Sequence, residues 1–453
     1  MHLSRKKTWM IIAGITVLVV VVLALPPVWS RVTYYSRDAY AKVKYWLNPP
    51  SEAVFVPSGS GSDPEVATAV AATLNAYAST PQPSVQPTAN PGVSTPQPTT
   101  PPATAFTPLP ASAYLPGVIS EPQLWNNCGP ATLSMYLSFY DWGFTQKEAA
   151  AVLKPNDRDK NVMPYEMIDF VNERTAQDAL WRYGGDLQTL KALLNAGFPV
   201  MVETGFEPAN LQKEGWMGHY LLLIGYDDTR QIFTTQDSYL LSHPPGGSEP
   251  IPEESWDDFR GFEVPYSELE EKWQAFNYVF IVVYPPDKVN DVLNILGPLA
   301  TDETANRIAY TRAVDEATSQ ADVRERFFAW FNAGTSAVYL QDYATAAAHF
   351  DAAFNLYPEI REDKRPWRIM WYQTGPYFAY YYTERYNDLI TLADQTLKAM
   401  SEPILEETYY WRGLAYYALG EKDKAIADLR DSMKYHPGFA PAESMLYQLG
   451  ETP

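Results

Sequence analysis

The order of apolar and polar positions divides the chain into segments of three kinds. An almost unbroken apolar run extends from Trp9 to Leu25. From about residue 115 onward, apolar positions recur with helical or strand periods, which predicts a folded body. The stretch between these parts is rich in Pro, Thr, Ser and Ala and has almost no charge. The pattern therefore predicts an apolar N-terminal helix, a linker and a folded body.

The apolar run predicts a transmembrane signal anchor within residues 1–30. Its length is at the short end of the roughly 17–25 residues that span a bilayer, and it exceeds a typical signal-peptide core. The positive-inside rule favours a cytoplasmic N-terminus and an extracytoplasmic body, because the run follows Arg5, Lys6 and Lys7. Basic residues after the run weaken this rule. Cleavage near Ala24, which would release a secreted protein, is the alternative.

Residues 31–114 are expected to form a juxtamembrane segment followed by a disordered linker rich in Pro, Thr and Ser. Such a tract cannot bury enough apolar surface to offset the entropy of ordering it. Its prolines favour extended conformations, so the linker would act as a semi-rigid stalk. A stalk after an anchor would lift the body away from the bilayer.

Residues 115–286 are predicted to form an α+β domain. Helical spacing is present at 128–141 and 186–196, and strand-like apolar runs are present at 220–226, 232–235 and 278–284. The second run is expected to pair with the first as a hairpin. Helices that precede most of the strands are typical of an α+β arrangement.

Residues 287–453 are predicted to form an all-α domain of helical repeats. Two sets of residues fit the tetratricopeptide pattern, whose period is about 34 residues. They are Trp330, Gly334, Ala346, Phe350, Ala353 and Pro358, then Tyr409, Gly413, Tyr416, Ala425 and Pro437. A looser unit with an insertion at 359–366 lies between them. An irregular helical bundle is the alternative.

The net charge of the chain disfavours one class of partner. The 453 residues carry a formal net charge of −20 at neutral pH. Such a surface repels nucleic acid, so a nucleic-acid partner is not expected. The single cysteine cannot form an intrachain disulfide, and a lone thiol in an exported protein suggests a catalytic role.

The candidate chemistry centres on that cysteine, Cys128. It stands in a polar, loop-like entry into the predicted helix at 128–141, where unpaired N–H groups and the helix dipole stabilise a thiolate. His219 could activate it, and Asp237 could fix the tautomer of His219. The backbone N–H of Cys128 and the side chain of Gln123 could form an oxyanion hole. This set predicts a cysteine hydrolase.

Each residue also has an ordinary structural interpretation. Cys128 could fill a core, His219 could be a hydrogen-bonded core histidine, and Asp237 could be a turn residue. The four residues together make the stronger case. The sequence contains no cluster of Cys and His that suggests a zinc site, so neither a metal nor a cofactor is expected.

At these residues the sequence resembles the C-39-like cysteine peptidases, relatives of the bacteriocin-processing peptidases with a papain-like fold. The resemblance covers roughly residues 115–286 and is carried by Gln123 to Leu133, Gly218-His219-Tyr220 and Asp237. It implies that Cys128 is the nucleophile, His219 the base, Asp237 the residue that orients His219, and Gln123 the oxyanion donor. The chain has no P-loop, and Asn127 stands where many members have Asp, so cleavage of bacteriocin leaders does not follow.

The sequence thus predicts a membrane-anchored, extracytoplasmic cysteine peptidase. Its substrate would be a peptide or protein, and its repeats would bind that substrate or a partner protein. Two alternatives remain open at this point. The papain-like domain could be an inactive scaffold that presents the repeats, or it could be a cell-wall amidase or transpeptidase on the same fold.

Overall fold

The computed structural model describes residues 109–453 except 157, 160, 208–214, 246–247 and 401, together with 52, 54–58 and the isolated positions 36, 40, 43 and 47. The predicted anchor and most of the predicted linker lie outside these residues. Among the helices of the described part, none combines the length and apolar character needed to cross a bilayer.

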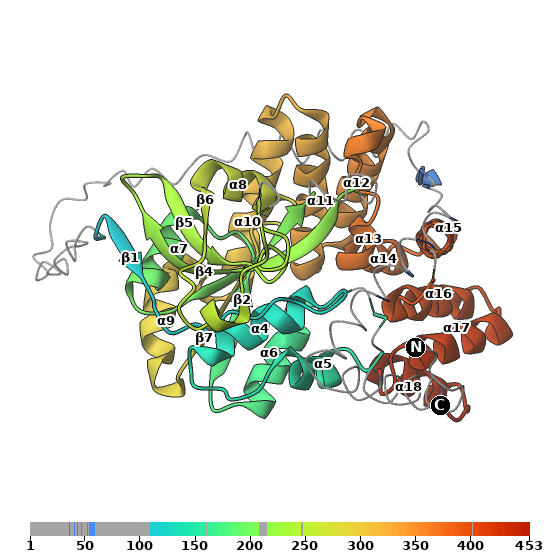
Figure 1. Ribbon diagram of the computed structural model, residues 1–453. Coiled ribbons are helices and arrows are strands. Elements are labelled where there is room, and N and C mark those ends of the chain that lie inside the picture. The colour runs from blue at the N-terminus through green and yellow to red at the C-terminus, as the bar shows by residue number, and fades with distance from the viewer. Residues whose placement is uncertain are drawn as a thin grey trace, which may run out of the picture.

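An antiparallel sheet forms the centre of the first domain (Figure 1). Within the described residues it has seven strands, in the order β2-β7-β3-β4-β5-β6, and β1 pairs with the end of β4. Their bounds are β1 (Ser112–Tyr114), β2 (Asp178–Arg182), β3 (Val200–Phe206), β4 (Met217–Asp227), β5 (Ile232–Gln236), β6 (Phe262–Pro265) and β7 (Phe280–Tyr284). The expected hairpin is the β4–β5 pair. β4 is longer than expected, and β7 begins later.

The two faces of the sheet bury alternate residues of the same strands, as the strand period of two requires. Met201 of β3 packs on one face with α4 (Cys128–Ser138), α5 (Gln146–Leu153) and α6 (Pro164–Arg174). Its neighbours Val200 and Val202 pack on the other face with α7 (Leu187–Asn195), α8 (Tyr266–Gln274) and α9 (Val289–Leu296). α4 stops at Ser138, three residues before the expected end. The central strands are buried on both sides, which gives the site a rigid base.

The chain beyond α9 is helical, as the sequence predicts. Its α-helices are α10 (Asp302–Ser319), α11 (Val323–Tyr339), α12 (Tyr343–Leu356), α13 (Ile369–Tyr372), α14 (Gly375–Tyr382), α15 (Tyr386–Lys398), α16 (Glu406–Ala418), α17 (Lys422–Tyr435) and α18 (Ala440–Gln448). Helices that follow each other in the chain pack together, most extensively α10 with α11, α11 with α12 and α16 with α17. In α11, a side-chain carbon at Gly334 would lie 2.8 Å from the ring of Phe350 in α12, so glycine allows this close approach. The expected insertion at 359–366 contains short 3₁₀ turns.

The repeats pack directly against the α+β domain. Trp216 and Phe276 of the α+β domain belong to the same apolar cluster as Phe328 of α11. The Asn332 side chain donates to the backbone oxygen of Gln274 at 2.6 Å, and the Gln373 side chain donates to that of Ala275 at 2.8 Å. Figure 1 shows the helices curving from α10 and α11 around to α16–α18, which lie near α5 and α6. The two parts therefore enclose the space between them.

Candidate active site

Cys128 is the first residue of α4, and hydrogen bonds fix that helix against the sheet. The hydroxyl of Tyr136, two turns along the helix, accepts from the backbone N–H of Val283 at 2.8 Å and donates to the backbone oxygen of Pro199. The Thr132 hydroxyl donates to the backbone oxygen of Tyr220 on β4. These bonds hold the start of the helix beside the strand that carries His219.

The turn before Cys128 is held by a residue that sequence reasoning missed. The buried Gln146 side chain accepts from the Leu124 N–H and from the Asn127 side-chain amide, each at 2.7 Å. Its own amide nitrogen donates to the backbone oxygen of Pro122 and to the Glu121 carboxylate. In the sequence, Gln146 only follows a helix N-cap at Thr145, so nothing signalled this role. The network fixes both ends of the segment from Gln123 to Cys128.

His219 and Asp237 come from adjacent strands. His219 lies in β4, and Asp237 directly follows β5. The His219 Nε2 atom is 2.8 Å from the Asp237 carboxylate, and both side chains are 4% exposed. The same carboxylate oxygen accepts from the N–H groups of Tyr239 and Leu240, so Asp237 cannot swing away without losing three bonds. Phe206 stacks on the imidazole with ring centroids 4.8 Å apart.

The thiol and the imidazole shift each other's pKa. Burial raises the pKa of Cys128, but hydrogen bonding and charge interaction with His219 outweigh it, so the pKa of the thiol is lowered. Burial lowers the pKa of His219, but the Asp237 carboxylate and the Cys128 thiolate raise it to about 10. Because Nε2 is bound to Asp237, Nδ1 is the nitrogen left for Cys128. The pair can therefore exist as thiolate and imidazolium at neutral pH.

Gln123 is fixed beside this pair by the residue after Asp237. Its Oε1 accepts from the Ser238 hydroxyl at 2.9 Å, and its backbone N–H donates to the Ser238 backbone oxygen at 2.9 Å. With the oxygen engaged in this way, the amide nitrogen of Gln123 is the end that can donate to a substrate. Gln236, on the other side of Asp237, bonds instead to Ser120 and Phe259.

Glu203 is a second residue that sequence reasoning missed. It lies on β3 opposite Tyr220, is 3% exposed, and has one carboxylate oxygen with no hydrogen-bond partner. Burial, together with the nearby Cys128 thiolate, raises the pKa of Glu203 well above its usual range. A glutamate at the end of the apolar run Val200–Val202 was the available signal, because a charge there opposes burial.

Glu203 lines a cavity of about 650 Å³ between the sheet and the repeats. The peptidase side contributes Trp181 and Phe276, and the repeats contribute Tyr372 and Trp411. Charge interaction with the Cys128 thiolate adds to burial in raising the pKa of Tyr372, as it does for Glu203. Cys128 and His219 are not among the residues that line the cavity, and it approaches them through Glu203 and Tyr372. Its charged lining residues are acidic: Glu166, Asp169, Glu203 and Glu407.

The structure thus brings together all four residues singled out in the sequence. Cys128 interacts with His219, His219 bonds Asp237, and Gln123 is held by Ser238. Nucleophile, base, orienting carboxylate and amide donor are the groups needed for acyl transfer through a thioester.

Comparisons with known proteins identify two similar segments of the chain. Residues 116–280 match the model of the Peptidase_C39 like family, and residues 407–438 match a tetratricopeptide repeat. Among solved structures, a chain described as a C39-like peptidase from Bacillus anthracis matches with 17% sequence identity and a TM-score of 0.28, covering 38% of this chain and 96% of that one. A comparison with curated proteins found no match. The chain therefore contains a segment, residues 116–280, that is similar to the Peptidase_C39 like family, and one tetratricopeptide repeat at residues 407–438.

Proposed function

We propose that this protein is a cysteine peptidase that hydrolyses peptide bonds through Cys128, His219 and Asp237. The proposal rests on the 2.8 Å bond between His219 Nε2 and Asp237, together with the interaction of Cys128 with the same imidazole. A scaffold kept only for its shape gains nothing from a buried ion pair of this kind, which costs desolvation energy.

The mechanism follows from the positions of the groups. The Cys128 thiolate attacks the carbonyl carbon, and the oxyanion accepts hydrogen bonds from the Cys128 N–H and the Gln123 amide. His219 Nδ1–H gives its proton to the leaving amine, which breaks the peptide bond and leaves a thioester. Neutral His219 then takes a proton from water as the water oxygen attacks the thioester carbon. The C–S bond breaks, which releases the acid and restores the Cys128 thiolate and the His219 imidazolium.

The cavity beside Glu203 supports a role for the repeats in holding the substrate. It is lined by aromatic side chains from both parts of the chain and by carboxylates, of which that of Glu203 is buried and those of Glu166 and Glu407 are half-buried. Aromatic faces and carboxylates together suit a cationic group, since both attract positive charge. The substrate is therefore a peptide with a Lys or Arg side chain near the cleaved bond. Burial raises the pKa of Glu203, and a cation bound beside it would lower that pKa again.

The direct test is hydrolysis of a peptide library by the purified full-length protein and by the Cys128→Ala variant. We expect cleavage next to basic residues by the wild type and loss of cleavage in the variant, since the nucleophile supplies several kcal/mol of barrier reduction. Equal cleavage by both would point to a contaminating peptidase. No cleavage by the wild type, across the library, would support the inactive scaffold instead.

The location of the protein is part of the proposal. An anchor at residues 1–30 and a stalk at 31–114 would display the peptidase and the repeats outside the cytoplasm, attached to the membrane. Alkaline extraction of membranes tests this, because an anchored protein stays with the bilayer and a secreted one does not. Protease added to intact cells should digest the body if it faces outward.

A further inference from the structure

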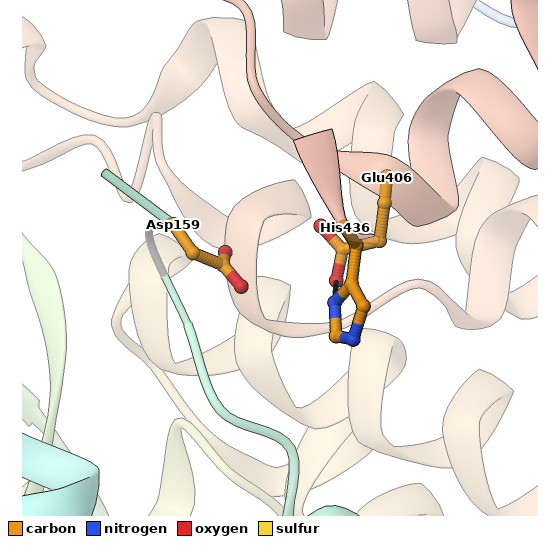
Figure 2. A group of neighbouring side chains, drawn as sticks. All are labelled: Asp159, Glu406 and His436. Carbon is orange, nitrogen blue, oxygen red and sulfur yellow. Dashed lines mark hydrogen bonds and ion pairs between the residues drawn. The ribbon is translucent and has the colours of Figure 1, made fainter. Parts of the chain in front are cut away.

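Two carboxylates and one imidazole lie together where the end of the repeats meets the peptidase domain. Asp159 comes from the loop after α5, whereas Glu406 and His436 come from the start of α16 and the end of α17. One potential ligand atom from each residue lies within 4.8 Å of those of the other two. Figure 2 shows the Asp159 carboxylate directed toward the Glu406–His436 pair. Asp159 precedes Glu406 by 247 positions and His436 by 277, so the three residues meet only in the folded chain.

One oxygen of this group lacks a partner. Glu406 is 3% exposed, and its Oε1 is bound to His436 Nδ1 at 3.2 Å. Its Oε2 is buried and has no hydrogen-bond partner among the described residues. A buried carboxylate oxygen without a donor costs substantial desolvation free energy. A bound cation would remove that cost, because it would supply the missing partner.

The surrounding charges also favour a cation. Burial and the neighbouring acids Asp159 and Glu166 raise the pKa of Glu406 well above its usual range. Burial and the charges of Glu406 and Asp159 do the same for Glu407. Arg158 pairs with Glu402 at 3.7 Å. Several acids and one histidine therefore lie close together at this site.

We propose that Asp159, Glu406 and His436 bind a divalent transition-metal ion, Zn²⁺ or Mn²⁺, that ties the last repeats to the peptidase domain. Two carboxylates and an imidazole are ligands that such ions accept, whereas an imidazole is a poor ligand for Ca²⁺ or Mg²⁺. Ligands about 2.0–2.2 Å from one ion stand roughly 3–4 Å apart, so the three groups need only a small contraction to enclose it.

The ion would also act on the active site. The backbone oxygen of Asp159 accepts from the Asn126 side chain, and Lys154 donates to the Asn126 backbone oxygen. Asn126 has a left-handed backbone, φ 55°, and lies two residues before Cys128. Fixing Asp159 through a metal therefore stiffens the turn that presents the thiol. The same ion would hold α16 and α17 at the far end of the substrate cavity.

Metal binding can be measured without peptidase activity. We suggest isothermal titration of ZnCl₂ or MnCl₂ into untagged full-length protein with the Cys128→Ala substitution, because the catalytic thiol itself binds Zn²⁺. The same background carries Glu406→Gln, which keeps the size of the side chain and removes its charge. Asp423→Asn is the matched control, since Asp423 is exposed on α17. Thermal melts of metal-free and metal-loaded protein accompany each titration.

We expect one ion per chain and a melting temperature raised by a few degrees in the parent and in Asp423→Asn. Glu406→Gln should lose at least tenfold in affinity and most of the metal-induced shift. Its metal-free melting temperature should be equal to or higher than that of the parent, because a like charge has been removed. Asp159→Asn should give the same loss of affinity, which covers the case in which Glu406→Gln folds poorly. Unchanged binding in both variants, or no binding by the parent, would overturn the proposal. These carboxyl groups would then be neutralised by protonation.

Discussion

The Ser238 hydroxyl donates a hydrogen bond to the side-chain oxygen of Gln123 over 2.9 Å, and so connects the proposed oxyanion donor to the residue after Asp237. The bond leaves the Gln123 amide nitrogen free to face a substrate carbonyl. Positioning of this kind affects the transition state more than substrate binding.

Ser238→Ala should therefore lower kcat by about tenfold with little change in KM. Direct loss of an oxyanion donor costs about a hundredfold or more, and here the donor remains but is less well held. Ser120→Ala is the control, because Ser120 donates to Gln236 on the far side of Asp237. A large KM effect, or an equal loss in the control, would show that Gln123 is not positioned in this way.

Asp237→Asn should narrow the active pH range from the alkaline side. The carboxylate raises the pKa of His219 to about 10, and the ion pair with Cys128 persists only below that pKa. Without the negative charge the pKa of His219 falls, so the alkaline limb of the rate profile moves to lower pH. Activity should fall, but less than in Cys128→Ala. A pH–rate profile identical to that of the wild type would mean that Asp237 only stabilises the turn that follows β5.

Glu203→Gln should reduce the preference for basic substrates. One oxygen of its carboxylate has no hydrogen-bond partner among the described residues and lies beside the cavity, and a neutral amide cannot balance a Lys or Arg side chain. We expect kcat/KM for a lysine peptide to drop at least tenfold, while the same peptide with norleucine in place of lysine changes little. An equal loss for both peptides would assign Glu203 to the fold, with no part in specificity.

Gly218→Ala should destabilise the packing of the repeats on the peptidase domain. A side-chain carbon at Gly218 would lie 2.8 Å from Phe276 and 2.9 Å from Tyr372, so one of these rings must move. Overpacking of this kind costs about 1–3 kcal/mol. Gly143→Ala, where nothing lies within 4 Å, is the control for thermal unfolding. Equal melting temperatures in the two variants would contradict close packing at this interface.

Local sequence patterns predicted the elements and the residues that carry their own signal. The strand period marked the β4–β5 hairpin, and a lone thiol before a helix marked Cys128. The role of Gln146 could not be predicted, because it depends on how α5 packs against the turn before Cys128. The later start of β7 has a local cause, since left-handed residues at Asn277 and Tyr278 continue the preceding turn.

The cluster of Asp159, Glu406 and His436 could not be predicted from the sequence either. Closely spaced Cys and His residues are the usual sequence signal of a metal site. The three donors here lie far apart in the sequence, and two of them are carboxylates. The cavity depends in the same way on how the repeats curve back over the sheet (Figure 1). Arrangements of this kind follow from tertiary packing, which short-range periodicity does not encode.

Activation of Cys128 by His219 can be tested directly by alkylation, because Cys128 is the only cysteine in the chain. The rate of carboxamidomethylation by iodoacetamide should be followed from pH 5 to 10 in the wild type and in His219→Ala. We expect rapid labelling of the wild type well below pH 8. The variant should be labelled only as an ordinary thiol ionises, near pH 8.5 or above. A wild-type protein whose labelling follows the same curve as His219→Ala would contradict this activation.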